Sequence, residues 1–177
     1  MLATRSARRG SFTLASGRKS SLYVDARLTT MSPDGLATIG PLALAAIHEA
    51  GWLADAVGGL TLGADPVSCA IAHASALAGT PVRAFTVRKE AKSHGTGKLI
   101  EGPFRSGDRV VVIEDVITTG GSALRAIDVI RTGGGIVLGV LSVVDREEGG
   151  RDALGAAGHA VISLTRAAEI VARMPAA

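Results

Sequence analysis

The sequence predicts an α/β domain built on a mainly parallel sheet. Short runs rich in Val and Ile alternate along the chain with longer segments rich in Ala and Leu, which is typical of strands connected by helices. The 177 residues are 47% hydrophobic and 20% charged, which suits one domain with a buried core, and no linker or repeat divides them. We therefore expect residues 1–177 to form a single domain that binds its ligand beyond the carboxyl ends of the strands.

Six segments have the length and the residue types of strands. Each is a short apolar, mostly β-branched run that Gly, Pro or polar residues bound. They are Leu22–Ala26, Ala56–Gly59, Val82–Val87, Arg109–Glu114, Ile136–Val144 and Ala160–Leu164. Because helical segments separate most of them, parallel pairing through crossover connections is expected.

Five helices are predicted between and after these strands. Ser32–Asp34 supplies an N-cap, a proline at the first helical position and an early acid, so that a helix begins there and runs to about Glu49. Ser122 is expected to cap another helix, which the glycines Gly133–Gly135 end. The remaining helical ranges are 66–77, 152–156 and 166–173.

Composition argues against several classes of protein. The net charge of +3 is mild, and the few aromatic residues (3%) are scattered rather than arranged for stacking on bases, so no nucleic-acid partner is expected. No uncharged apolar run reaches the ~18 residues of a membrane helix, and the N-terminus lacks the apolar stretch of a secretory signal. Cys69 lies in an apolar run and is interpreted as a buried thiol, and a cytoplasmic location is expected.

The most informative stretch is VVVIEDVITTGGSA, residues 110–123. An apolar strand ends in two adjacent acids, Glu114 and Asp115, and a turn rich in hydroxyls and glycine then leads into a helix. Backbone N–H groups of such a turn, together with the helix N-terminus, form a site for a phosphate dianion. Two acids beside it can accept hydrogen bonds from vicinal hydroxyls. Phosphate next to a diol describes a ribose 5-phosphate, although an acidic strand end before a capped helix is also a common structural feature.

This stretch resembles the phosphoribosyl pyrophosphate signature of the type I phosphoribosyltransferases. The resemblance implies the fold of that family, with a mainly parallel sheet flanked by helices and a small N-terminal hood over residues 1–30. It also implies that Glu114 and Asp115 hold the ribose hydroxyls, with Asp115 among the catalytic residues. The residues that would hold the 5-phosphate are Thr118, Thr119, Gly120, Gly121 and Ser122.

A second stretch, residues 88–102, reads RKEAKSHGTGKLIEG and is rich in positive charge. Taken alone, it is a mobile basic loop in solvent. The pattern RKEAKxHG resembles the catalytic loop of orotate phosphoribosyltransferases, which implies a loop that reaches into the partner's site of a homodimer. By this resemblance the pyrophosphate-binding residues are Arg88, Lys89, Lys92 and His94, of which Lys92 and His94 are catalytic. Positioned cations stabilise the charge that gathers on a departing pyrophosphate.

Two shorter matches concern the orotate side. FTLASGRKSSLYVD, residues 12–25, resembles the family's base-side segment, which places Lys19 and Tyr23 near orotate. Arg146, in VVDREEGG, matches the arginine that grips orotate, and Thr118 is expected beside the base. A guanidinium suits a flat ligand that carries a carboxylate and a carbonyl. The chain departs from many family members at Ala15, where they have Lys.

The stretch VGGLTLGADP, residues 57–66, corresponds to the family's pyrophosphate loop. Leu62 and Gly63 stand where many members have Tyr and Lys. The resemblance implies Mg²⁺ as the cofactor, held mainly through substrate oxygens, with Asp65 as the nearest protein group.

The expected reaction joins orotate to the ribose of phosphoribosyl pyrophosphate. A phosphoribosyltransferase for another base is one alternative, although a purine site gains little from Arg146. A regulator that senses phosphoribosyl pyrophosphate without catalysis is a second alternative. Such a protein usually carries a nucleic-acid-binding appendage or loses the catalytic loop, and the sequence provides neither feature.

Overall fold

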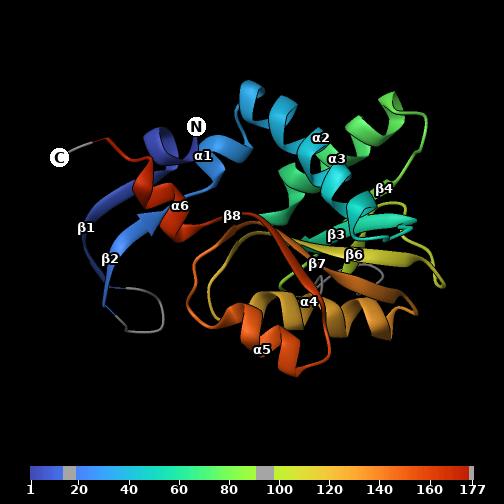
Figure 1. The fold of residues 1–177 in the computed structure, drawn as a ribbon. Coiled ribbons are helices and arrows are strands. Elements are labelled where there is room, and N and C mark those ends of the chain that lie inside the picture. The colour runs from blue at the N-terminus through green and yellow to red at the C-terminus, as the bar shows by residue number, and fades with distance from the viewer. Residues whose placement is uncertain (14–18, 91–97, 176–177) are drawn as a thin grey trace.

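The computed structural model describes residues 1–13, 19–90 and 98–175. Its main sheet has six strands in the order β5-β4-β3-β6-β7-β8 (Figure 1). Their bounds are β3 (Ala56–Leu60), β4 (Arg83–Val87), β5 (Ile100–Glu101), β6 (Arg109–Ile117), β7 (Ile136–Asp145) and β8 (Val161–Arg166). Every pairing is parallel except that of β4 with β5, which confirms the predicted mainly parallel sheet.

Helices cover both faces of this sheet. In the view of Figure 1, α2 (Pro33–Glu49) and α3 (Ala64–Leu77) lie above it, and α4 (Gly121–Thr132) and α5 (Gly150–Ala156) lie below it. Helix α2 begins as predicted, because the Ser32 hydroxyl accepts a hydrogen bond from the Gly35 amide at 3.2 Å. In the described part of the chain, no helix has both the length and the apolar composition that crossing a bilayer requires.

Two details of the helices differ from the prediction. The N-cap of α4 is Gly120 and not Ser122, because the turn before the helix needs a left-handed backbone (φ 84°) that glycine adopts without strain. Ser122 is instead the second residue of the helix. Cys69 is exposed on α3 rather than buried, because the buried face of that helix is formed by the residues on either side of it.

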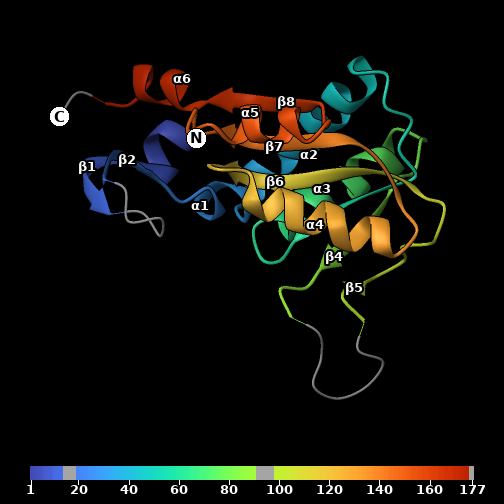
Figure 2. The ribbon, with the colours of Figure 1, turned by 90° about the horizontal axis from the view of Figure 1, so that it is seen from below.

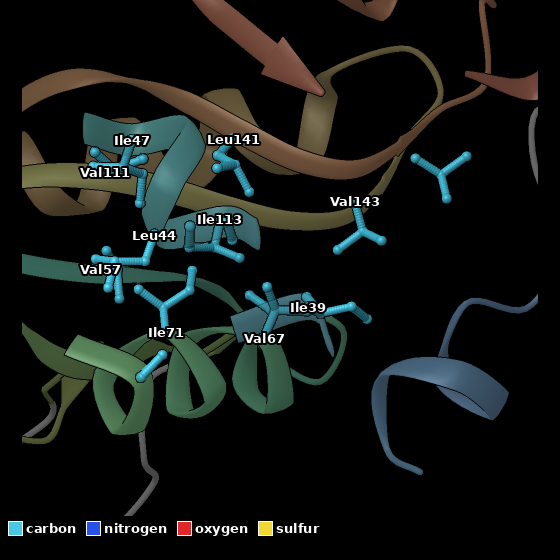
Figure 3. Packing of buried hydrophobic residues seen from close by; sticks show 14 of the residues in the cluster. Ile39, Leu44, Ile47, Val57, Val67, Ile71, Val111, Ile113, Leu141 and Val143 are labelled. Carbon is cyan, nitrogen blue, oxygen red and sulfur yellow. The ribbon is translucent and has the colours of Figure 1, made fainter. Parts of the chain in front are cut away.

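The strands of the main sheet bury side chains on both faces, as a parallel sheet between two helical layers must. Val111 and Ile113 of β6 pack toward α2 and α3 (Figure 3), whereas Val110 and Val112 pack toward α4. Burial of each such side chain stabilises the fold by about 1.5–3 kcal/mol. The central strands are therefore rigid supports for the groups at their carboxyl ends.

A second, two-stranded sheet lies beside the main one, near the chain termini (Figures 1 and 2). It is an antiparallel hairpin of β1 (Ala7–Thr13) and β2 (Lys19–Val24), preceded by a π-helical turn, η1 (Leu2–Ser6). Short helices α1 (Arg27–Thr30) and α6 (Ala167–Ala172) flank it. The sequence predicted β2 slightly late and missed β1, whose ARRGSFT sequence lacks the apolar alternation of a strand.

The close approach of α2 to α3 provides a test of the packing. A Cβ atom added to Gly40 would lie 2.5 Å from the Ala70 carbonyl oxygen of α3. Gly40→Ala should therefore destabilise the fold by about 1–3 kcal/mol, and each kcal/mol lowers the melting temperature by about 2–4 °C. Gly155→Ala is the matched control, because nothing lies within 4 Å of its added Cβ and alanine favours a helix. Equal melting temperatures for the two variants would contradict this account of the helix contact.

Candidate active site

A cavity of about 370 Å³ opens at the carboxyl ends of β3 and β6, where the fold class predicts a ligand. Its walls come from the end of β2, the β3–α3 loop, the end of β6 and the loop after β7. A second cavity of about 40 Å³ adjoins it and follows the turn into α4. The two share Glu114, Val116, Thr118 and Ser122.

The smaller cavity is formed by the turn Thr118–Ser122 and the first residues of α4. Gly120 turns the chain so that α4 points its N-terminus at this space, and the first turn of the helix contains no acidic residue. The positive end of the helix dipole, free backbone N–H groups and three hydroxyl side chains therefore face the same small volume. This arrangement suits a phosphate dianion.

The larger cavity contains the acid pair. Glu114 is only 7% exposed, and its Oε1 has no hydrogen-bond partner among the residues that the structure describes. Burial, and secondarily the charge of Asp115, raises the pKa of Glu114 to about 8. Burial also raises the pKa of Asp115, although the Val116 amide donates to its Oδ1 at 2.9 Å and opposes the shift. Glu114 is thus a buried acceptor and Asp115 a half-buried one, and few donors stabilise their ionised forms.

Arg146 lies in the wall of the same cavity and is buried. Its Nη2 donates to the Leu22 carbonyl at 2.8 Å and to the Ser20 hydroxyl at 3.1 Å, both on β2. Nη2 also lies 2.8 Å from a carboxylate oxygen of Glu148. Nε is buried, and none of the described residues accepts a hydrogen bond from it. The guanidinium is thus held firmly at one nitrogen.

Asp25 and Arg27, which were not among the predicted site residues, line the cavity beside Tyr23. The Arg27 guanidinium donates to both oxygens of Asp25, at 2.8 and 3.0 Å, and lies close enough to Asp115 to favour its ionised form. The predicted strand Leu22–Ala26 included Asp25 but not Arg27. Because β2 ends at Val24, both residues follow a strand end.

Asp65 connects the β3–α3 loop to β4 through its two carboxylate oxygens. One of its oxygens accepts from the Thr61 hydroxyl at 2.7 Å and the other from the Thr86 hydroxyl of β4 at 2.8 Å. In the described part of the chain, no group of three or more His, Cys, Asp or Glu side chains could hold a metal ion. Gly63 in the same loop leaves room for the acid pair, since its added Cβ would lie 2.3 Å from Asp115 Oδ1.

Most of the predicted site residues line these two cavities. They are Tyr23, Lys89, Glu114, Asp115, Thr118, Thr119, Gly120, Gly121, Ser122 and Arg146. Lys19 and Arg88 line neither cavity; Arg88 lies where β4 ends, 3.6 Å from Glu101. Lys92, His94 and Ala15 fall outside the described residues. The connection after β4 does not extend over the whole predicted range 88–102, because Ile100–Glu101 forms β5 and pairs with β4.

Comparison with known proteins identifies the family. No protein-family model matches the chain. The orotate phosphoribosyltransferase of Aquifex aeolicus is 46% identical over 160 residues, a match that covers 90% of this chain and 86% of that protein. The chain belongs to the orotate phosphoribosyltransferase family. The family's type I fold, expected from the sequence, is likewise confirmed by the solved structures.

Two solved orotate phosphoribosyltransferases, both from Mycobacterium tuberculosis H37Rv, are similar in fold. One, in complex with Fe(III) dicitrate, has a TM-score of 0.82 and 45% identity, and the match covers 94% of this chain and 92% of that chain. The other, in complex with 5-phospho-alpha-D-ribosyl 1-diphosphate, has a TM-score of 0.76 and 43% identity, with 90% and 89% covered.

The raised pKa of Glu114 predicts how stability depends on pH. Between pH 4.5 and about 8 the unfolded chain ionises Glu114 while the folded protein keeps it protonated, so this group destabilises the fold increasingly as pH rises. Glu114→Gln removes that effect. Even one pKa unit corresponds to about 1.4 kcal/mol, so the variant should melt at least about 3 °C above the wild type at pH 8.5. At pH 4.5 the wild type and the variant should have the same melting temperature.

Glu169→Gln is a control, because the pKa of Glu169 is shifted in the opposite direction to that of Glu114. The Thr165 hydroxyl donates to Glu169 and lowers its pKa, so this carboxylate stabilises the fold above its ordinary pKa. Its amide variant should melt no higher than the wild type at pH 8.5. A stabilising effect of Glu114→Gln that is the same at both pH values would show that Glu114 is not protonated in the free protein.

Proposed function

We propose that this chain transfers the 5-phosphoribosyl group from phosphoribosyl pyrophosphate to N1 of orotate, with release of pyrophosphate and formation of orotidine 5′-monophosphate. One observation gives this proposal its main support. A phosphate-sized turn, an acid pair of which Glu114 is buried, and a buried arginine follow one another along two connected cavities. They provide, in order, for the 5-phosphate, the ribose hydroxyls and an anionic base.

Each substrate group has a matching protein group. The turn Thr118–Ser122 receives the 5-phosphate through backbone N–H groups and hydroxyls. The ribose hydroxyls donate to Glu114 and Asp115, which satisfies the unpaired Oε1 of Glu114. Orotate lies between Tyr23 and Arg146, and Thr118 reaches it from the phosphate turn.

Catalysis on this arrangement depends on positioning and charge. The bond between C1 of the ribose and the pyrophosphate oxygen breaks with its electron pair on pyrophosphate, and positive charge develops on the ribose. N1 of orotate loses its proton to the departing pyrophosphate and donates the electron pair of the new bond. The acid pair lies beside the ribose, where carboxylates stabilise that developing charge. Lys89 lines the same cavity and, with Arg88, Lys92 and His94 of the loop, is proposed to stabilise the departing pyrophosphate.

Magnesium is proposed as the cofactor. Since Asp65 accepts hydrogen bonds from two threonines, the ion would be held mainly by oxygens of phosphoribosyl pyrophosphate, and the acid pair could add carboxylate oxygens from the same cavity. Bound there, it would neutralise pyrophosphate charge and so assist its departure.

Substrate choice tests the proposal. An ultraviolet assay should show loss of orotate that requires both phosphoribosyl pyrophosphate and magnesium, and uracil, which lacks the carboxylate, should be used far less. Loss of a charge-assisted contact should cost about 2–4 kcal/mol in kcat/KM, or about 30- to 900-fold. Equal turnover of uracil or adenine would point to a phosphoribosyltransferase for another base, and no turnover at all would favour the regulator.

A shared site across a homodimer is also proposed, on the resemblance of residues 88–102 to the family's loop. Lys92→Ala and Asp115→Asn should each be nearly inactive alone. If the loop acts on the partner's site, half of the randomly mixed dimers contain one intact site, so equal mixing should restore about a quarter of wild-type activity. No recovery under conditions of demonstrated subunit exchange would mean that each loop serves its own site.

A further inference from the structure

The backbone at Glu147, directly after Arg146, has an unusual conformation. Its φ is 56°, in the left-handed region, and the other described residues with positive φ are glycines. A residue with a side chain rarely adopts this conformation, because its Cβ crowds the backbone. Such strain is retained where the surrounding contacts fix the backbone and where the side chain makes a contact that glycine cannot make.

The hydrogen bonds of Glu147 show what its side chain contacts. Its amide donates to Asp145 Oδ1 at 2.8 Å, which closes a tight turn. Its side-chain Oε2 accepts from the amide of Ala168 at 2.9 Å, at the beginning of α6. The turn brings Glu148 back onto Arg146, where its carboxylate lies 2.8 Å from Nη2. Glu147 therefore ties the segment that orients Arg146 to the C-terminal helix.

Helix α6 is in turn tied to the N-terminal hairpin. Arg9 of β1 donates to the Val171 carbonyl of α6 at 3.1 Å. Arg9 is also the register partner of Leu22 on β2, whose carbonyl accepts from Arg146. The contacts thus form a closed ring from Arg146 through β2, β1, α6 and Glu147 back to Arg146. Figures 1 and 2 both show α6 beside the hairpin.

We propose that Glu147 is a positioning residue for the orotate site, which acts through its bond to α6 by fixing the turn that presents Glu148 to Arg146. The inference rests on the proposed function, since it assigns Arg146 to orotate. It implies that the last helix and the first hairpin, which are far apart in sequence, jointly determine affinity for the base. Affinity for phosphoribosyl pyrophosphate depends on α4, β6 and the basic loop that follows β4, none of which belongs to this ring.

Two variants of one side chain test this inference. Glu147→Gly suits the left-handed backbone but loses the acceptor, whereas Glu147→Gln keeps an acceptor oxygen at the same reach. Glu147→Gly should raise KM for orotate about 3- to 10-fold, the equilibrium cost of one hydrogen bond, and should leave KM for phosphoribosyl pyrophosphate within about 2-fold of the wild type. Glu147→Gln should restore KM for orotate to within about 2-fold of the wild type.

The possible outcomes separate the inference from the proposed function. If the wild type does not consume orotate, the proposed function fails before any variant is compared. If the wild type is active, an unchanged KM for orotate in Glu147→Gly overturns the inference, whether or not the melting temperature falls. Equal increases in both KM values would indicate a general disturbance of the site and also overturn it. A glutamine variant as impaired as the glycine variant would show that charge, and not the bond to Ala168, matters.

Discussion

The burial of Glu114 beside a half-buried Asp115, near the carboxyl end of β6, is the constraint on which the rest of the site depends. Glu114 and Asp115 lie within the last four residues of β6, after the buried run Val110–Ile113, and few donors reach them. Burial of this kind costs free energy in the free protein, because an ionised carboxylate loses its hydration. Strand pairing and packing must offset this cost. Strand β6 pairs with β3 and β7 on its two edges and packs against helices on both faces.

The neighbouring parts of the site follow from this constraint. The β3–α3 loop must approach the acids without covering them, which Gly63 permits and the Thr61–Asp65 bond maintains. The chain leaves β6 through a glycine turn, so the proposed phosphate site lies directly beside the proposed ribose site. The proposed base site is made differently, since Arg146 donates to β2 of the hairpin and the neighbouring Glu147 accepts from α6. In this proposal the sheet supports the phosphoribosyl group, and the hairpin with α6 supports the base.

The sequence allowed much of this to be predicted, for physical reasons that differ from part to part. Strand β6, its acid pair and the glycine turn are local, so hydrophobic pattern and turn chemistry in 14 residues were sufficient. Strand β1 was missed because its residues are held by pairing with β2, a tertiary effect that overrides local propensity. The cap of α4 was assigned to Ser122 because serine commonly caps helices, whereas the left-handed turn selected Gly120. The contacts of Glu147 with α6, 21 residues away, follow from no local pattern.

Titration of Glu114 in the free protein tests the central claim most directly. Carboxyl-labelled glutamate gives a carbon NMR resonance for each side chain, and the spectrum of Glu114→Gln identifies the one that belongs to Glu114. The account predicts a titration midpoint near pH 8, as burial implies, and a resonance that shifts when phosphoribosyl pyrophosphate and magnesium are added. A midpoint near the ordinary 4.5, or a resonance that saturating substrate leaves unmoved, would contradict the assignment of this acid pair to the ribose.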